Sequence, residues 1–160
     1  MSEILIIIGL ILLNGVFSMS EVAMISARKS RLSTDAKKGS KAAKKALDLS
    51  GNPDRFLSTV QIGITLIGIL TGIYSGNKIA TDLTDFMLSC GVSSAYAAVL
   101  AQGTIVVVVT YLTIIFGELV PKRIGLSVAE AVAKLMARPM NVLAMIASPF
   151  VWLLSKSTEL

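Results

Sequence analysis

Three long apolar stretches constrain this chain more than any other feature of its sequence. A helix needs about 20 predominantly apolar residues to cross the hydrocarbon core of a bilayer. Residues 4–27, 56–74 and 95–116 are long enough, and the last two contain no charged side chain. Lipid offers no partners for backbone N–H and C=O groups, so such stretches must form helices. We therefore predict an all-α membrane protein with three transmembrane helices in a single domain, residues 1–160.

The distribution of basic residues predicts the orientation of the chain. The loop at 28–55 contains nine lysines and arginines, whereas the loop at 75–94 contains one, Lys78. Lysine and arginine are enriched in cytoplasmic loops, so we expect the N-terminus outside and the C-terminus in the cytoplasm. The basic loop can also attract the anionic lipids of the inner leaflet. The first stretch has neither the basic flank nor the cleavage site of a signal peptide, and we treat it as a permanent span.

Shorter segments are predicted to form amphipathic helices at the membrane surface. In the basic loop we expect a short helix that ends before Pro53. Two more are predicted near the C-terminus, at about 127–138 and about 139–154. Ser127 and Glu130 match the S-x-x-E capping box that begins many helices. Proline disfavours a helical conformation in the preceding residue, so we expect the first of these two helices to stop before the second begins.

Composition excludes several classes of function. The chain has no histidine and one cysteine, Cys90, so a Ser-His-Asp triad, a disulfide within the chain and a cysteine-cluster metal site are all excluded. The net charge is +5, but the basic residues lie between apolar stretches. A membrane surface is therefore the expected partner, and nucleic acid is not. No catalytic set of residues is visible, and we predict that the chain is not an enzyme.

Polar side chains within the apolar stretches are the candidates for function. Asn14, Ser18 and Glu21 are spaced i, i+4 and i+7, which places them on one face of a helix. Glu118 lies just beyond the third stretch. A carboxylate at membrane depth is costly and indicates an ion or proton site by default. The alternative is that both carboxylates are hydrated near the cytoplasmic headgroups.

Pro121 is expected to add backbone oxygens to this set. Proline has no N–H, and its ring clashes with the carbonyl four residues earlier, which is that of Gly117. We expect the helix to break here and to expose carbonyls, which persist at membrane depth only where they line a cavity or bind a cation. In the second stretch Ser58, Thr65 and Gly68 add hydroxyls or let another backbone approach, although helix packing also explains them. Oxygen ligands without thiolate or imidazole suit hard cations such as Mg²⁺, Ca²⁺, Mn²⁺ or Na⁺.

Three segments resemble the transmembrane domain of the CorC/CNNM (cyclin M) family. They are NGVFSMSEVAMISARKSRL at 14–32, NPDRFLSTVQIGITLIGILTGIYSG at 52–76 and FGELVPKRIGL at 116–126. They occur in the order that the family has, and the resemblance covers essentially the whole chain. It implies a dimeric protein of a bacterial or archaeal inner membrane that is linked to magnesium efflux, with three transmembrane helices and juxtamembrane helices.

The resemblance also implies a Mg²⁺ site among the three helices. Ser18 and Glu21 match polar positions of the family's first-helix motif, and Gly117 and Glu118 match its G-E-x-x-P motif. Weaker candidates, placed by proximity and not by motif, are Asn14, Ser58, Thr65 and Gly68.

Further expectations from the resemblance concern coupling and partners. Family members are homodimers, and Na⁺ exchange is a common proposal for what drives transport. Full-length members continue into a cytoplasmic CBS pair that binds nucleotide with magnesium, and we expect that pair to be absent from these 160 residues. The alternative function is a membrane anchor and dimerisation scaffold for the CBS domains, without an ion path of its own.

Overall fold

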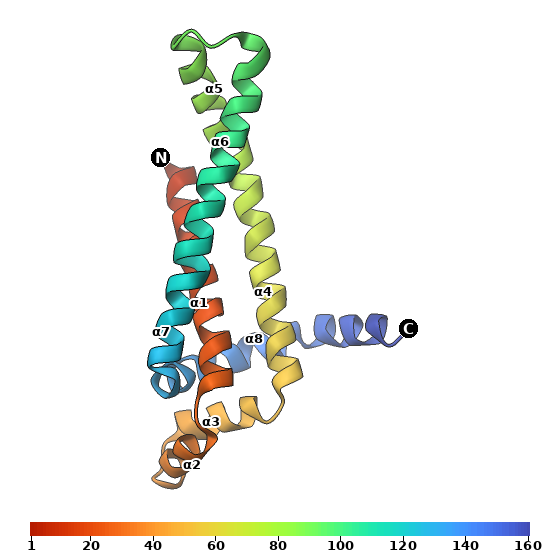
Figure 1. Ribbon diagram of the computed structural model, residues 1–160. Coiled ribbons are helices and arrows are strands. Elements are labelled where there is room, and N and C mark those ends of the chain that lie inside the picture. The colour runs from red at the N-terminus through yellow and green to blue at the C-terminus, as the bar shows by residue number, and fades with distance from the viewer.

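The protein is all-helical over the part of the chain that the computed structural model describes, which is residues 1–160 apart from the side chain of Asn77. The α-helices are α1 (Ser2–Ser26), α2 (Lys29–Lys37), α3 (Lys41–Ser50), α4 (Pro53–Tyr74), α5 (Ala80–Ser89), α6 (Ser94–Ile114), α7 (Val120–Ser127) and α8 (Ala129–Thr158), and two π-helical turns are η1 (Ser75–Ile79) and η2 (Ile115–Leu119). Helices α1, α4 and α6 run along the long axis of the molecule, and α8 crosses one end of them (Figure 1). The predicted all-α class is confirmed.

Four helices, and not the three predicted, are long and apolar enough to cross a membrane. They are α1, α4, the stretch Ser94–Ser127 and α8. The prediction of two short helices at about 127–138 and about 139–154, which followed from the two prolines, was wrong. Helix α8 is one helix of 30 residues that passes through Pro139 and Pro149. Its buried face continues on both sides of Pro139, at Ala133 and Met140, so tertiary packing outweighs the loss of one helical hydrogen bond.

The predicted helix break at Pro121 does not occur. The chain passes from α6 through the π-helical turn η2 directly into α7. A π-helical turn accommodates an extra residue and shifts the hydrogen bonds of the helix. Pro121 thereby comes to lie in the first turn of α7, where a missing N–H is tolerated.

Helix α1 packs against η2 and α7 with the two backbones in contact. A Cβ atom on Gly15 would lie 2.9 Å from the carbonyl oxygen of Phe116, and one on Gly125 would lie 2.7 Å from that of Met19. No side chain fits in these spaces, so glycine permits the approach. We call this contact the glycine seam, and it spans about one turn of α1, from Gly15 to Met19, and about two and a half turns of η2 and α7, from Phe116 to Gly125.

The two short helices α2 and α3 occupy the basic loop, where a single helix was expected. Ser40 caps α3, and its Oγ accepts a hydrogen bond from the backbone N–H of Ala43 at 3.2 Å. The predicted capping box at the start of α8 is absent. Val128 is the N-cap residue there, and the Ser127 hydroxyl donates to the carbonyl of Arg123.

The best-buried part of the molecule is the end that carries α2, α3 and α8. Leu32, Phe56, Val60 and Met140 are almost completely buried at this end. Toward the α5 end α6 buries little, and many of its large apolar side chains are exposed. An exposed apolar surface of this extent indicates contact with lipid or with another protein.

Candidate functional site

A buried amide bridges the first and third long helices. Asn14 is 7% exposed, and its Nδ2 donates a hydrogen bond to the carbonyl oxygen of Gly117 at 3.0 Å. The residue that would normally donate to this carbonyl is Pro121, which has no N–H. Asn14 therefore supplies the donor that Pro121 lacks. The sequence indicated a freed carbonyl here, and the structure adds that a side chain of α1 binds it.

Ser18 lies one turn along α1 from Asn14 and is 1% exposed. Its hydroxyl makes no hydrogen bond within the described part of the chain. The neighbouring Ser20 differs, because its hydroxyl donates to the carbonyl of Val16 at 2.6 Å. Ser18 thus keeps its oxygen lone pairs and its proton available near the bridge.

The two candidate carboxylates have different surroundings. Glu21 is partly buried on α1, and no ion pair involves it in the described structure. Glu118 is 49% exposed, and its Oε1 lies 2.8 Å from Nζ of Lys122. Lys122 neutralises Glu118, whereas no basic side chain pairs with Glu21 in the described part of the chain. Among the described residues there is no group of three or more acidic, histidine or cysteine side chains that could hold a metal.

The candidates on α4 lie at different depths. Phe17 of α1 packs over Gly63, where a Cβ atom would lie 2.5 Å from the ring. Because α4 runs antiparallel to α1 (Figure 1), this contact places Ser58 at about the depth of Glu21. Thr65 is exposed, and its hydroxyl accepts a hydrogen bond from a glutamine one turn earlier at 3.4 Å. Ser58 is therefore better placed than Thr65 to contribute near the glutamate.

Gly68 lines a cleft between α4 and α6 with a volume of about 270 Å³. Four of the other lining residues carry hydroxyls, namely Thr71, Ser75, Thr110 and Thr113. Only Gly68 among these five stood out in the sequence. The hydroxyls come from α4, η1 and α6, so their convergence depends on the tertiary structure.

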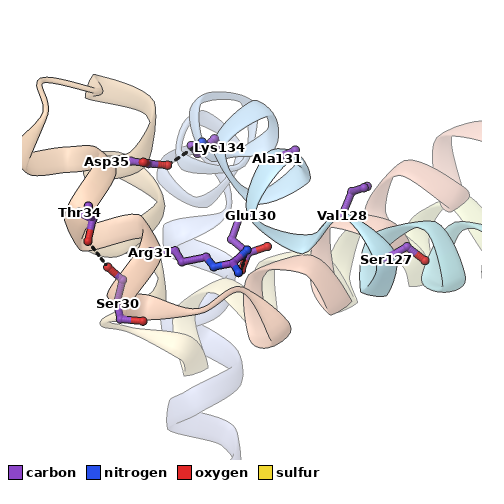
Figure 2. A pocket seen from close by; sticks show the side chains of 9 residues that line it. All are labelled: Ser30, Arg31, Thr34, Asp35, Ser127, Val128, Glu130, Ala131 and Lys134. Atoms are coloured by element: carbon purple, nitrogen blue, oxygen red, sulfur yellow. Dashed lines mark hydrogen bonds and ion pairs between the residues drawn. The ribbon is translucent and has the colours of Figure 1, made fainter.

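A polar cavity of about 540 Å³ lies between α2 and the start of α8 (Figure 2). Nζ of Lys134 lies 2.8 Å from Oδ2 of Asp35, and Arg31 lies 3.9 Å from Glu130. The hydrogen bond and the charge of Lys134 hold the pKa of Asp35 below its ordinary value. Arg31 and Lys134 each pair with a carboxylate, so these two ion pairs hold α2 against α8. No pattern in the sequence marked this cavity, because Asp35 and Lys134 are 99 positions apart.

Known proteins are similar in sequence to this chain over almost its full length. The family profile described as cyclin M transmembrane N-terminal domain matches residues 5–160. The UPF0053 protein sll0260 of Synechocystis sp. is 47% identical over 157 residues, which is 98% of this chain and 35% of that protein. The UPF0053 protein YhdP of Bacillus subtilis is 33% identical over 158 residues, or 99% of this chain and 36% of that protein.

A third relative bears a functional name. The polyamine export protein of Escherichia coli strain K12 is 33% identical over 152 residues, which is 95% of this chain and 34% of that protein. The chain therefore spans about a third of the length of the curated relatives it matches.

Proposed function

This chain belongs to the CNNM family, the cyclin M transmembrane domain family, and from that premise we propose that it transports Mg²⁺ across a bacterial inner membrane. In this proposal α1, α4 and the stretch Ser94–Ser127 cross the bilayer, and α8 lies along its cytoplasmic surface. In Figure 1 α8 runs across the end of the other long helices and not along them, which supports this arrangement. So does Trp152, an amphipathic ring suited to headgroup depth, with Nζ of Lys156 5.1 Å from its centre. The basic loop then faces the cytoplasm, and the N-terminus is outside.

The observation that carries the proposal is the bridge between Asn14 and Gly117, with Ser18 beside it. These polar groups are buried at membrane depth, where they are expensive and mark functional positions. They also adjoin a π-helical turn, a feature that occurs frequently at functional sites. When the Asn14 amide turns away from Gly117, its own carbonyl, the Gly117 carbonyl and the Ser18 hydroxyl become oxygen ligands for a hard cation.

Electrostatic attraction in this proposal comes chiefly from Glu21. It is two turns from Asn14 toward the cytoplasmic side, and no basic side chain neutralises it. Ser58 lies at about the same depth on α4 and adds a hydroxyl oxygen. Glu118 has a smaller role while Lys122 is paired with it.

The chemistry of the bridge favours Mg²⁺ over an organic cation. Amide, hydroxyl and carbonyl oxygens suit a small hard ion that is held at short distances. A polyamine is the rival cargo, because one relative is named a polyamine export protein. A polyamine has several ammonium groups on a flexible stem and needs several free carboxylates, whereas Lys122 occupies one of the two candidates.

Further parts of the proposal concern the whole protein. We propose a homodimer, contact with anionic inner-leaflet lipids, Na⁺ as a coupling ion, and a cytoplasmic CBS pair in the longer chain. The rival proposal is a membrane anchor and dimerisation scaffold without an ion path. It gains from the many exposed apolar side chains, which a dimer would cover. It leaves the Ser18 hydroxyl, which makes no hydrogen bond in the described structure, without a role.

Calorimetric titration of the purified chain with Mg²⁺ in detergent distinguishes these proposals. We expect a response that Ca²⁺, Na⁺ and spermidine do not reproduce. Ser18→Ala and Glu21→Gln should each weaken binding by about tenfold, equivalent to about 1.4 kcal/mol. Thr104→Ala is the control, because the Thr104 hydroxyl bonds only a carbonyl of its own helix, and its affinity should equal that of the wild type.

Each other outcome points to a different conclusion. No response from a folded wild-type chain would favour the scaffold. A response to spermidine alone would favour polyamine transport. Wild-type affinity in both Ser18→Ala and Glu21→Gln would refute the site, even if Mg²⁺ binds.

A further inference from the structure

Two nitrogen donors of this chain bind oxygens of Gly117 and Glu118. Nδ2 of Asn14 donates to the Gly117 carbonyl at 3.0 Å, and Nζ of Lys122 lies 2.8 Å from Oε1 of Glu118. Carbonyl and carboxylate oxygens are the type of ligand that suits a small divalent cation. In this conformation the side chains of Asn14 and Lys122 therefore make the contacts that a cation at these oxygens would make.

The ion pair between Lys122 and Glu118 lies far from the basic end of the first helix. The glycine seam sets Gly15 beside Phe116, two residues before Glu118, and about 20 Å of chain at the rise of a helix separates Gly15 from Arg28, the first basic residue. A lysine near the end of a transmembrane helix usually extends toward water. Lys122 instead reaches back one turn to Glu118, toward the α5 end. In the proposed orientation its ammonium is therefore directed into the membrane, where it offsets the cost of a lone carboxylate.

The geometry of this ion pair allows a cation to replace the lysine. The side chains of Lys122 and Glu118 are 34% and 49% exposed, and Oε2 of Glu118 has no hydrogen bond in the described part of the chain. Exposed ion pairs are weak, because each partner loses side-chain freedom when the pair forms. A divalent cation can approach Oε2 first, and its double charge then attracts the carboxylate more strongly than the ammonium does.

We propose that Lys122 is a tethered competitor of the transported cation: its ammonium holds the Glu118 carboxylate while the ion is absent and leaves it when Mg²⁺ binds. The inference rests on the proposed transport function and adds a residue that sets the affinity of the site. Without the ion, Lys122 neutralises Glu118. With the ion, Glu118 and Glu21 match the two charges of Mg²⁺, and the flexible Lys122 side chain turns toward the cytoplasmic headgroups.

A purely structural role for Lys122 is the rival explanation. Glutamate and lysine at positions i and i+4 stabilise a helix, and this pair spans the step from the π-helical turn η2 to α7. In that role the ammonium stays on Glu118 when Mg²⁺ is added. The two explanations therefore predict opposite responses of the Lys122 amine to the ion.

The first measurement is the rate at which sulfosuccinimidyl acetate acetylates each lysine of the purified chain in detergent, read by mass spectrometry. The reagent attacks the free amine, and a carboxylate that holds the ammonium protects it. Lys134 is the internal control, because its Nζ also lies 2.8 Å from a carboxylate oxygen, that of Asp35, and its side chain is 32% exposed. Choline chloride at the same ionic strength controls for the screening of ion pairs by salt.

We expect MgCl₂ to speed the acetylation of Lys122 by about fivefold, the factor that corresponds to an ion pair of about 1 kcal/mol, and to leave that of Lys134 unchanged. In Glu118→Gln the Lys122 amine should react at the faster rate without Mg²⁺, and the ion should then have no further effect.

The second measurement is the affinity for Mg²⁺, determined by calorimetry in detergent. Lys122→Met removes the competitor and should tighten binding by about fivefold, whereas Lys122→Arg keeps a cation at this position and should not tighten it. Arg123→Met is the matched control. It removes the same charge one residue later, from an exposed side chain without an ion pair in the described structure, and its affinity should stay near that of the wild type.

Either of two results would overturn the inference. One is a Lys122 acetylation rate that does not change when Mg²⁺ is added to a wild-type chain that binds the ion. The other is a Lys122→Met affinity equal to or weaker than that of the wild type. The labelling of the wild type needs no substitution, so a variant that fails to fold leaves this test in place.

The inference and the transport proposal fail in different ways. A wild-type chain that binds Mg²⁺ without faster acetylation of Lys122 would refute the competitor and leave the ion site. Absence of Mg²⁺ binding from both the wild type and Lys122→Met would refute the two together.

Discussion

Replacing Asn14 by leucine tests whether its amide is the structural partner of the Gly117 carbonyl. Asn14→Leu keeps a side chain of similar length but removes the donor that lies 3.0 Å from that carbonyl. The carbonyl would then be buried without a donor, which costs about 1–3 kcal/mol. Hydrogen bonds between helices in membranes average about 0.6 kcal/mol and reach about 1.7 kcal/mol. We therefore expect Asn14→Leu to lower the free energy of unfolding by about 1–2 kcal/mol.

The assay is reversible unfolding of the purified chain in mixed micelles, followed by circular dichroism. Gln61→Leu is the matched control, because Gln61 is an exposed amide whose bond, at 3.4 Å, stays within its own helix. Its change should stay within about 0.5 kcal/mol. Equal losses in the two variants would contradict the bridge as a stabilising contact.

Pro121→Ala allows a sharper form of the same test. Alanine restores an N–H at position 121 that the Gly117 carbonyl can accept within the helix. In this background Asn14→Leu should cost about 1 kcal/mol less than in the wild type, as in a double-mutant cycle between coupled sites. An unchanged cost would show that Asn14 acts through some contact other than Gly117, and the reasoning above would be refuted.

Three further changes probe other contacts. Gly15→Ala should destabilise the chain by about 1–3 kcal/mol, because its Cβ would lie 2.9 Å from the Phe116 carbonyl oxygen. Gly9→Ala is the control and should not destabilise the chain, because nothing lies within 4 Å of a Cβ at that position. Equal unfolding midpoints for the two variants would argue against the glycine seam. Ser40→Ala should lower the stability of α3 by about 1 kcal/mol through loss of its cap, and unchanged amide hydrogen exchange in α3 would exclude such a role. The lowered pKa of Asp35 means that its ion pair with Lys134 stabilises the fold above the ordinary pKa and is lost as the pH falls through the lowered value. The protection of the α2 amides, taken as the intrinsic exchange rate at each pH divided by the measured one, should therefore fall in acid for the wild type, and the same fall in Asp35→Asn would contradict this.

Three of the four helices that are long and apolar enough to cross a membrane could be predicted from the sequence, because that property depends on hydropathy over about 20 consecutive residues. The all-α class followed from the same patterns, and Asn14, Ser18 and Glu21 stood out as polar groups in an apolar stretch. Each of these inferences uses residues within a few turns of one another. Local patterns of this range are visible in a sequence without knowledge of the fold.

The structure contradicts the predictions at positions where a contact between residues far apart in the sequence outweighs a local preference. Pro121 was expected to break its helix, but a π-helical turn absorbs it while Asn14, more than 100 positions earlier, binds the freed carbonyl. Pro139 was expected to end a helix, but packing on both sides of it keeps α8 continuous.

The sequence by itself determined three of the four segments that suit a membrane, which face of the first helix is polar, and which loop is basic. Only the tertiary structure decided that Lys122 neutralises Glu118 while Glu21 stays unpaired, and that hydroxyls from α4 and α6 line one cleft. The physical reason is one of range. Hydropathy and helical periodicity act along the chain, whereas hydrogen bonds, ion pairs and close backbone packing depend on which distant residues meet in space.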